Sequence, residues 1–195
     1  MKIKHLILAL AVVGFASCNN DDSSNNPAPT IENYVVESGH DHEDHARLSE
    51  EDHAHIVPGE EAVVEADLKG HQLSYAQVDV HWGAGHEHSA RVANTDDHVQ
   101  WTQKYTYWFG ISQEEAEAKG AYNYALTAAG DFPNEHHLHV HMDVPTTWTK
   151  DGVTGPVEEG DYHFVLFLVD QEGQRTEKAL TVEVAAEDHE PHASL

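Results

Sequence analysis

The 195-residue chain has little cysteine, few basic side chains and no long apolar run outside its N-terminus, and each shortage excludes a class of protein. The only cysteine, Cys18, excludes intrachain disulfides and zinc sites built from several thiolates. Ten lysines and arginines stand against 35 aspartates and glutamates, which gives a formal net charge of -25. Nucleic acid and anionic membrane surfaces repel such a charge, so we expect cations as partners.

Common enzyme signatures are also missing from the sequence. "HEDH" and "HEPH" lack the spacing of the zinc-protease helix motif, and there is no glycine-rich phosphate loop and no serine in a nucleophile elbow. We therefore expect a non-enzymatic protein, although a histidine-bound zinc ion with an open coordination position could hydrolyse a substrate.

The N-terminus predicts export. "MKIKHLILALAVVGFASC" has a basic start, an apolar stretch from Leu6 to Phe15, and the small residues Ala16 and Ser17 before Cys18. The apolar stretch is about half the length of a membrane-spanning helix, which favours a secretion signal over a permanent anchor. The segment resembles the lipobox of bacterial lipoproteins. We predict a signal peptide over residues 1–17, a lipid on Cys18, and an exported protein anchored to the outer membrane, periplasmic or surface-exposed.

Polar segments flank the predicted domain at both ends. "NNDDSSNNPAP" buries almost nothing, so residues 18–29 are predicted to be a flexible tether, and residues 187–195 a disordered tail. The acidic, serine- and asparagine-rich start resembles surface-export signals of some Bacteroidetes-type lipoproteins, and a plain linker is the alternative.

From Thr30 onward, short segments of alternating apolar and polar residues are separated by turn residues. This period of two is typical of half-buried β-strands, and seven short strands suit an immunoglobulin-like β-sandwich. We predict one all-β domain over residues 30–186. The expected strands are "IENYVVE", "EAVVEADL", "LSYAQVDVHW", "HVQWTQKYTYWF", "HLHVHMDV", "YHFVLFLVD" and "ALTVEVA".

Three local features refine this fold. Ser112 and Glu115 have the spacing of a capping box at the start of one short, polar surface helix, which Gly120 ends. "FVLFLV" is apolar at every position, which predicts a central strand covered on both faces. "GDYHF" resembles the tyrosine corner of Greek-key sandwiches, with Tyr162 as the candidate.

Three stretches, "GEEAVVEADLKGHQLSYAQVDVH", "HVHMDVP" and "GDYHFVLFLVDQEGQ", follow a lipoprotein signal in this order. Together they resemble a family of Ig-like lipoprotein domains, the domain of unknown function number 4625. The resemblance implies an Ig-like fold and an envelope location, and it makes residues 39–56 a histidine-rich insertion. The family's recurrent positions correspond here to His81, His141, Asp143, Pro145, His163 and Asp170.

The strand "HLHVHMDV" carries a row of histidines, His137, His139 and His141, whose side chains alternation places on the outer face. In an Ig-like layout this strand pairs with "EAVVEADL", whose outward residues are expected to be Val63, Glu65 and Asp67. Imidazoles beside carboxylates suit Zn²⁺, Ni²⁺ or Cu²⁺. We do not expect a Cu⁺ site, because the thioethers and thiolates that this ion prefers are nearly absent.

A second candidate metal site lies on the opposite sheet. If "VDVHW" and "YHFVLF" run antiparallel, His81 and His163 are neighbours on the outer face. The glycine-rich loop "GAGHEHS" could then bring His86 or His88 to the same point.

Each of these interpretations has an alternative. The histidine row could be a solvated surface balanced by carboxylates, His81 and His163 could form a structural pair, and the insertion could be a polar loop instead of a metal-scavenging arm. We predict an envelope lipoprotein that captures or buffers divalent transition metal. The alternative is a structural or adhesion module that binds protein or glycan, which exposed aromatics from Trp101, Tyr105, Tyr107, Trp108 and Phe109 would support.

Overall fold

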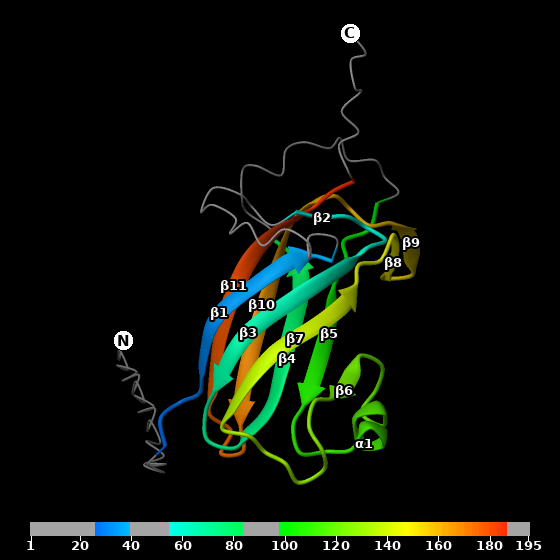
Figure 1. Cartoon of the computed structure of the whole chain (residues 1–195). Coiled ribbons are helices and arrows are strands. Elements are labelled where there is room, and N and C mark those ends of the chain that lie inside the picture. The colour runs from blue at the N-terminus through cyan, green and yellow to red at the C-terminus, as the bar shows by residue number, and fades with distance from the viewer. Residues whose placement is uncertain (1–25, 40–54, 84–97, 187–195) are drawn as a thin grey trace, which may run out of the picture.

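The structure, a computed structural model, describes residues 26–39, 55–83 and 98–186, and its strands form two main β-sheets (Figure 1). The smaller sheet has the order β1-β3-β7, with β1 (Thr30–Ser38), β3 (Glu61–Lys69) and β7 (Glu135–Asp143). The larger sheet has the order β2-β11-β10-β4-β5-β6. Its strands are β2 (His55–Ile56), β4 (Leu73–Trp82), β5 (Gln103–Trp108), β6 (Asn123–Ala125), β10 (Gly160–Asp170) and β11 (Arg175–Val184).

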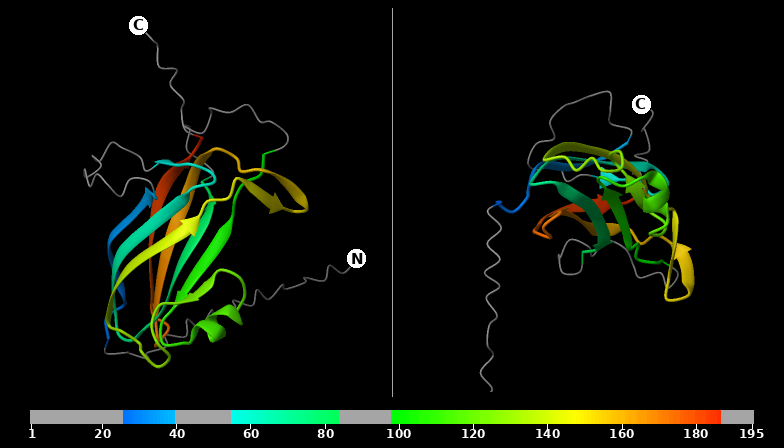
Figure 2. Two further views of the ribbon diagram at one scale, coloured as in Figure 1. Left: turned by 45° about the vertical axis from the view of Figure 1, so that its right-hand side comes forward. Right: turned by 90° about the horizontal axis from the view of Figure 1, so that it is seen from below.

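Seen from below in Figure 2, the two sheets are two layers. This confirms the predicted all-β sandwich, and all seven expected strands are present. The strand expected to start at His98 begins later, at Gln103. A separate hairpin of β8 (Thr147–Lys150) and β9 (Val153–Pro156) was not anticipated.

The core lies between the layers, where alternation along each strand places the apolar side chains. Val78 and Val80 of β4 are fully buried, and Leu138 and Met142 of β7 are at most 1% exposed. Tyr34 links the layers, because its hydroxyl donates to the backbone oxygen of Phe164, 3.1 Å away in the other sheet. Burial raises the pKa of the Tyr34 phenol, so it stays a donor throughout the ordinary pH range.

Tyr162 forms the expected tyrosine corner at the start of β10. Its hydroxyl donates to the backbone oxygen of Glu158 at 2.8 Å and accepts from the backbone nitrogen of Trp101 at 3.2 Å. Both contacts are formed by a fully buried side chain. The corner therefore fixes two loop segments to the core at the upper end of the sandwich in Figure 1.

The aromatic strand β5 faces inward. Trp101, Tyr105, Tyr107 and Phe109 are all buried, and Trp108 on the other face packs between the ring of Tyr75 and the ammonium group of Lys119. These side chains therefore give no support to an adhesive surface.

The predicted helix is α1 (Gln113–Glu117), and its capping box is complete. The Ser112 hydroxyl accepts from the backbone nitrogen of Glu115, whose carboxylate accepts from the backbone nitrogen of Ser112. The Ser112 backbone N–H is the main reason that the pKa of Glu115 is lowered.

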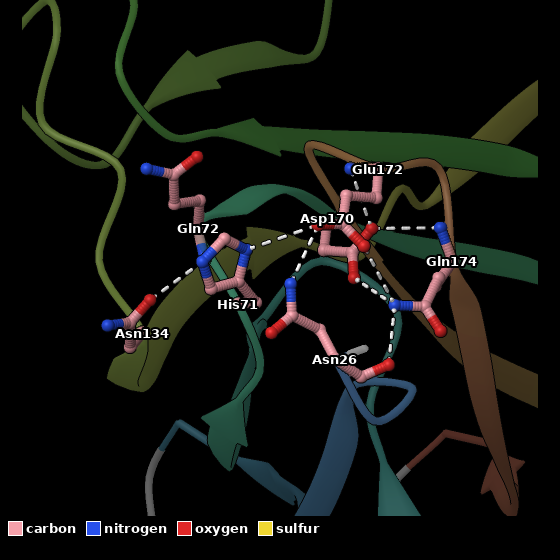
Figure 3. A network of polar contacts seen from close by, with 7 residues as sticks. All are labelled: Asn26, His71, Gln72, Asn134, Asp170, Glu172 and Gln174. Atoms are coloured by element: carbon pink, nitrogen blue, oxygen red, sulfur yellow. Dashed lines mark hydrogen bonds and ion pairs between the residues drawn. The ribbon is translucent and has the colours of Figure 1, made fainter. Parts of the chain in front are cut away.

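Residues 26–29, at the end of the predicted tether, contact the sandwich. The Asn26 amide donates to Glu172 at 2.7 Å and its backbone oxygen accepts from Gln174 at 3.2 Å (Figure 3). The buried carboxylate of Asp170 orders this turn by accepting from the backbone nitrogens of Glu172 and Gln174. The predicted signal peptide, Cys18 and the rest of the predicted tether lie outside the described residues, as do residues 40–54 of the predicted insertion and the predicted tail at 187–195.

Two expectations about buried faces were wrong in detail. On the outer face of β10, Val165 and Phe167 remain partly exposed whereas Val169 is buried, so this face of the central strand is covered only in part. Only the guanidinium group of Arg175 covers the Phe167 ring among the contacts described, 4.0 Å from its centroid. Conversely, Val63 is 1% exposed although it belongs to the outer row, where the register places it between Glu37 and His141.

Candidate metal site on the outer face of β7

The three histidines of β7 lie opposite carboxylates of β3, as the sequence predicts. Asp67 pairs with His137 and Glu65 with His139 in the antiparallel register, whereas His141 lies opposite Val63. All three imidazoles are between 42% and 61% exposed. The row is therefore an accessible surface and not part of the core.

Each imidazole of the row is held by one carboxylate through its Nδ1 atom. The Nδ1···O distances are 2.9 Å from His137 to Asp67, 2.6 Å from His139 to Glu65 and 2.9 Å from His141 to Glu61. Glu65 and Asp67, predicted as ligands, thus contact the far side of the rings from Nε2. A carboxylate in this position fixes the tautomer and the orientation of a histidine.

Glu61 is the residue that sequence reasoning missed. It lies opposite Asp143 in the register and reaches His141 diagonally, one step further along the face. Alternation already put Glu61 on the same face as Glu65, and diagonal neighbours on a sheet are within reach of long side chains. The signal was therefore present in "EAVVEADL".

The pair of His137 and Asp67 is tied into the fold. Asn33 lies at a bulge of β1 with φ of 48°, a left-handed conformation that asparagine tolerates, and its amide donates to Asp67 at 2.6 Å. The Asn33 amide and then His137 lower the pKa of Asp67. Asp67 is thus shared between two partners and orders the start of the row.

His139 and His141 instead face each other. Their Nε2 atoms are 3.2 Å apart, and their ring centroids lie 5.1 Å apart at an angle of 71°. Because an ionised carboxylate only accepts hydrogen bonds, each Nδ1 must donate, which leaves a lone pair on Nε2 of a neutral ring. A contact of this length between the two Nε2 atoms is a hydrogen bond when one of them carries a proton.

The separation of the two nitrogens matches that of ligands on one metal ion. Zinc binds imidazole nitrogen at about 2.0–2.1 Å, so two nitrogens of a tetrahedral site are about 3.3 Å apart. Within residues 26–39, 55–83 and 98–186, no group of three or more His, Cys, Asp or Glu side chains is placed to hold a metal ion. A metal ion between His139 and His141 would thus have two protein ligands among the described residues, the two Nε2 atoms. Its other coordination positions would be open to water or another ligand.

His136 precedes the row and has a different environment, because alternation places it on the inner face of β7. It is only partly exposed and its ring meets that of Phe109 edge to face, with centroids 5.0 Å apart. Burial, followed by the charge of His137, lowers the pKa of His136, against an opposing effect of Asp131. His136 therefore packs as a neutral side chain.

The second predicted pair is also assembled. His81 and His163 are register partners on β4 and β10, and their rings meet edge to face with centroids 5.5 Å apart. Asp79 lies 3.6 Å from His81 and forms a 2.7 Å ion pair with Lys104. His86 and His88 lie outside the described residues. Because this pair belongs to the larger sheet, it lies on the opposite outer face from His139 and His141.

Fold and site together define an all-β sandwich domain whose smaller sheet presents histidines braced by carboxylates. The chain belongs to the family described as Domain of unknown function (DUF4625), whose model matches residues 16–185. This confirms the resemblance found in the sequence. No curated protein matches the chain, and in the part of the chain described here no helix is long and apolar enough to cross a membrane.

One solved structure with similarity is the crystal structure of Spo0M, a sporulation control protein from Bacillus subtilis. It is 14% identical to this chain, with a TM-score of 0.35. The match covers 83% of this chain and 51% of that one, so the chain spans about half the length of Spo0M. A likeness this distant carries no information on function.

Proposed function

We propose that this protein is a lipid-anchored envelope protein that binds a divalent transition metal through His139 and His141, for capture or buffering. The observation that carries the proposal is the 3.2 Å separation of the two Nε2 atoms, each on a ring whose Nδ1 is held by a carboxylate. Such bracing directs the second nitrogen of the ring toward a metal and raises its basicity.

The surroundings of the pair favour a cation over a shared proton as the functional occupant. Glu61 and Glu65 add two negative charges beside the pair, and the whole chain carries a formal charge of -25. Divalent ions are therefore attracted to this face at long range. Imidazole donors suit Zn²⁺, Ni²⁺ and Cu²⁺, and the usual affinity order makes Cu²⁺ the tightest of the three.

A two-nitrogen site on an exposed sheet is suited to reversible binding. Metal held by two protein ligands keeps positions for water or a receiving ligand, which allows exchange. The lipobox at Cys18 supports an envelope location, where metal ions from outside the cell would be met first.

Isothermal titration of the whole tag-free chain with Cu²⁺, Ni²⁺ and Zn²⁺ tests this function. We expect a dissociation constant below about 100 μM for Cu²⁺ at neutral pH, and weaker binding toward pH 5, because protonated imidazole does not coordinate. Replacing both ligands (His139→Gln with His141→Gln) should abolish this binding step.

His137→Gln is the matched control, because it removes a histidine from the same strand and the same face. It should leave the binding step in place, as should the pair His81→Gln with His163→Gln on the other sheet. Binding that survives in the His139 and His141 double variant, or that disappears in the His137 control, would contradict the proposed site.

A further inference from the structure

An aromatic cleft opens beside the histidine pair, where the edge strands of the two sheets approach each other. Its volume is about 300 Å³, and it is lined from the smaller sheet by β3 and β7 and from the larger sheet by β5 and β6, with β8 closing one side. The size is at the lower end of the range for small-molecule sites.

Four aromatic side chains line this cleft: Tyr105, Tyr122, Tyr124 and Trp148. The Tyr122 ring meets that of Tyr105 edge to face at 5.2 Å, and the Tyr124 ring stacks on buried Tyr107 at 5.5 Å and 22°. Tyr122 and Tyr124 nevertheless remain 39% and 40% exposed. Part of each ring is therefore not packed against the core and faces the cleft entrance.

The backbone at Tyr122 has an unfavourable conformation for a tyrosine. Its φ is 63°, a left-handed conformation that bulky side chains seldom adopt. The Tyr122 backbone oxygen accepts from the nitrogen of Thr106 at 2.8 Å, which fixes the residue on β5. The aromatic wall is thus built into the sheet edge.

The charge of the cleft is negative. Glu61 and Asp143 are the acidic residues of its lining, and among the described lining residues there is no lysine or arginine. The Tyr105 hydroxyl donates to the Asp143 backbone oxygen at 3.3 Å. Burial is the main reason that the pKa of Tyr105 is raised, and the Asp143 carboxylate, which lines the same cleft, adds to it.

We propose that this cleft binds the alkylammonium group of a small organic cation. Aromatic faces attract cations through the ring quadrupole, and a set of rings with a nearby carboxylate is the usual receptor for quaternary or primary ammonium groups. Two carboxylates and a chain charge of -25 complement a cation, which favours it over a neutral sugar stacked on the same rings.

Titration of the whole tag-free chain with choline, followed by NMR in excess chelator, tests this site without any bound metal. The neutral isostere 3,3-dimethylbutan-1-ol and N-acetylglucosamine serve as comparison ligands. We expect choline to bind with a dissociation constant below about 10 mM, and at least about tenfold more tightly than either neutral ligand.

Two variants locate the binding. Tyr124→Leu removes an exposed ring, and Asp143→Asn removes one charge from an exposed side chain, so each should weaken choline binding about fivefold or more. Asp131→Asn, which removes the same charge outside the cleft, should leave it unchanged. Thermal unfolding checks that each variant is folded.

Three outcomes would overturn the cation site. They are no choline binding below about 50 mM, equal or tighter binding of a neutral ligand, and choline binding that is unchanged in folded Asp143→Asn. Because the chelator removes metal, these outcomes are independent of the test of the histidine pair.

Discussion

At the scale of single residues, the four histidines of β7 have different partners. His136 lies on the inner face and packs on Phe109. In the outer row, His137 is tied to Asp67, and His139 and His141 direct Nε2 atoms at each other. The sequence "HHLHVHMDVP" predicts the row but does not distinguish its members. What distinguishes them is the diagonal reach of Glu61 and the bulge at Asn33, both of which depend on register.

The carboxylates behind the pair should tune metal affinity without touching the metal. We expect Glu61→Gln and Glu65→Gln each to weaken Cu²⁺ binding by about tenfold, the lower end of the effect of orienting partners, because the site is exposed. Asp67→Asn removes the same charge from the same face and should change the affinity less than about twofold. Titration calorimetry measures all three, and an equal loss in Asp67→Asn would indicate a general charge effect instead.

His136 should make stability depend on pH. Its pKa in the folded state is lowered from 6.5 by burial, so its favourable contribution is complete above about pH 6.5 and is lost as pH falls through the folded-state value. We expect thermal stability in chelator to decline less steeply between pH 7.5 and 5 in His136→Gln than in the natural chain. The stability difference between the two proteins at pH 7.5 measures the lost packing on Phe109 and is subtracted at every pH. If stability then depends on pH equally in both, the lowered pKa of His136 is contradicted.

At the scale of elements, alternation predicts the long strands because each buries one face. Short elements lack that periodicity, which is why β2, β6 and the β8–β9 hairpin were missed. The hairpin did carry a signal: the two residues between its strands are Asp151 and Gly152, both with positive φ, and "DG" is typical of a tight two-residue turn. The apolar pattern around it was too weak to indicate strands.

Removing the tyrosine corner should destabilise the sandwich. Tyr162→Phe leaves the backbone oxygen of Glu158 and the backbone nitrogen of Trp101 without this buried partner, and we expect a loss of about 1–3 kcal/mol in the free energy of unfolding. Tyr75→Phe, at a partly exposed position on β4, should change it by less than about 0.5 kcal/mol. Urea unfolding of the two variants compares them directly, and equal losses would rule out a special role of the corner.

At the scale of the whole molecule, the end of the predicted tether and the histidine pair lie at different places on the sandwich. Asn26 is fixed beside the β10–β11 turn by Glu172 and Gln174. Strand β7 runs from that end of the sandwich toward the β8–β9 hairpin (Figure 1), and His139 and His141 belong to its second half. The aromatic cleft is lined by Glu61 and by His141, one member of the pair, so the two candidate sites are neighbours on the smaller sheet.

Lipidation is tested by replacing its predicted acceptor. In a bacterial host that processes lipoproteins, we expect the natural chain to fractionate with membranes and Cys18→Ser to be released in soluble form, because the lipid supplies the membrane affinity. Mass spectrometry of the N-terminus identifies the acylated cysteine. Equal membrane association of both forms would contradict a lipid anchor at Cys18.

The central claim is that His139 and His141 share one metal ion through their Nε2 atoms. NMR correlations to the imidazole nitrogens during titration with Zn²⁺ report it atom by atom. We expect the Nε2 signals of His139 and His141 to shift together toward values of metal-bound nitrogen while each Nδ1 keeps its proton. Saturation with Zn²⁺ that leaves these two Nε2 signals unchanged, or that removes the Nδ1 protons, would contradict the account.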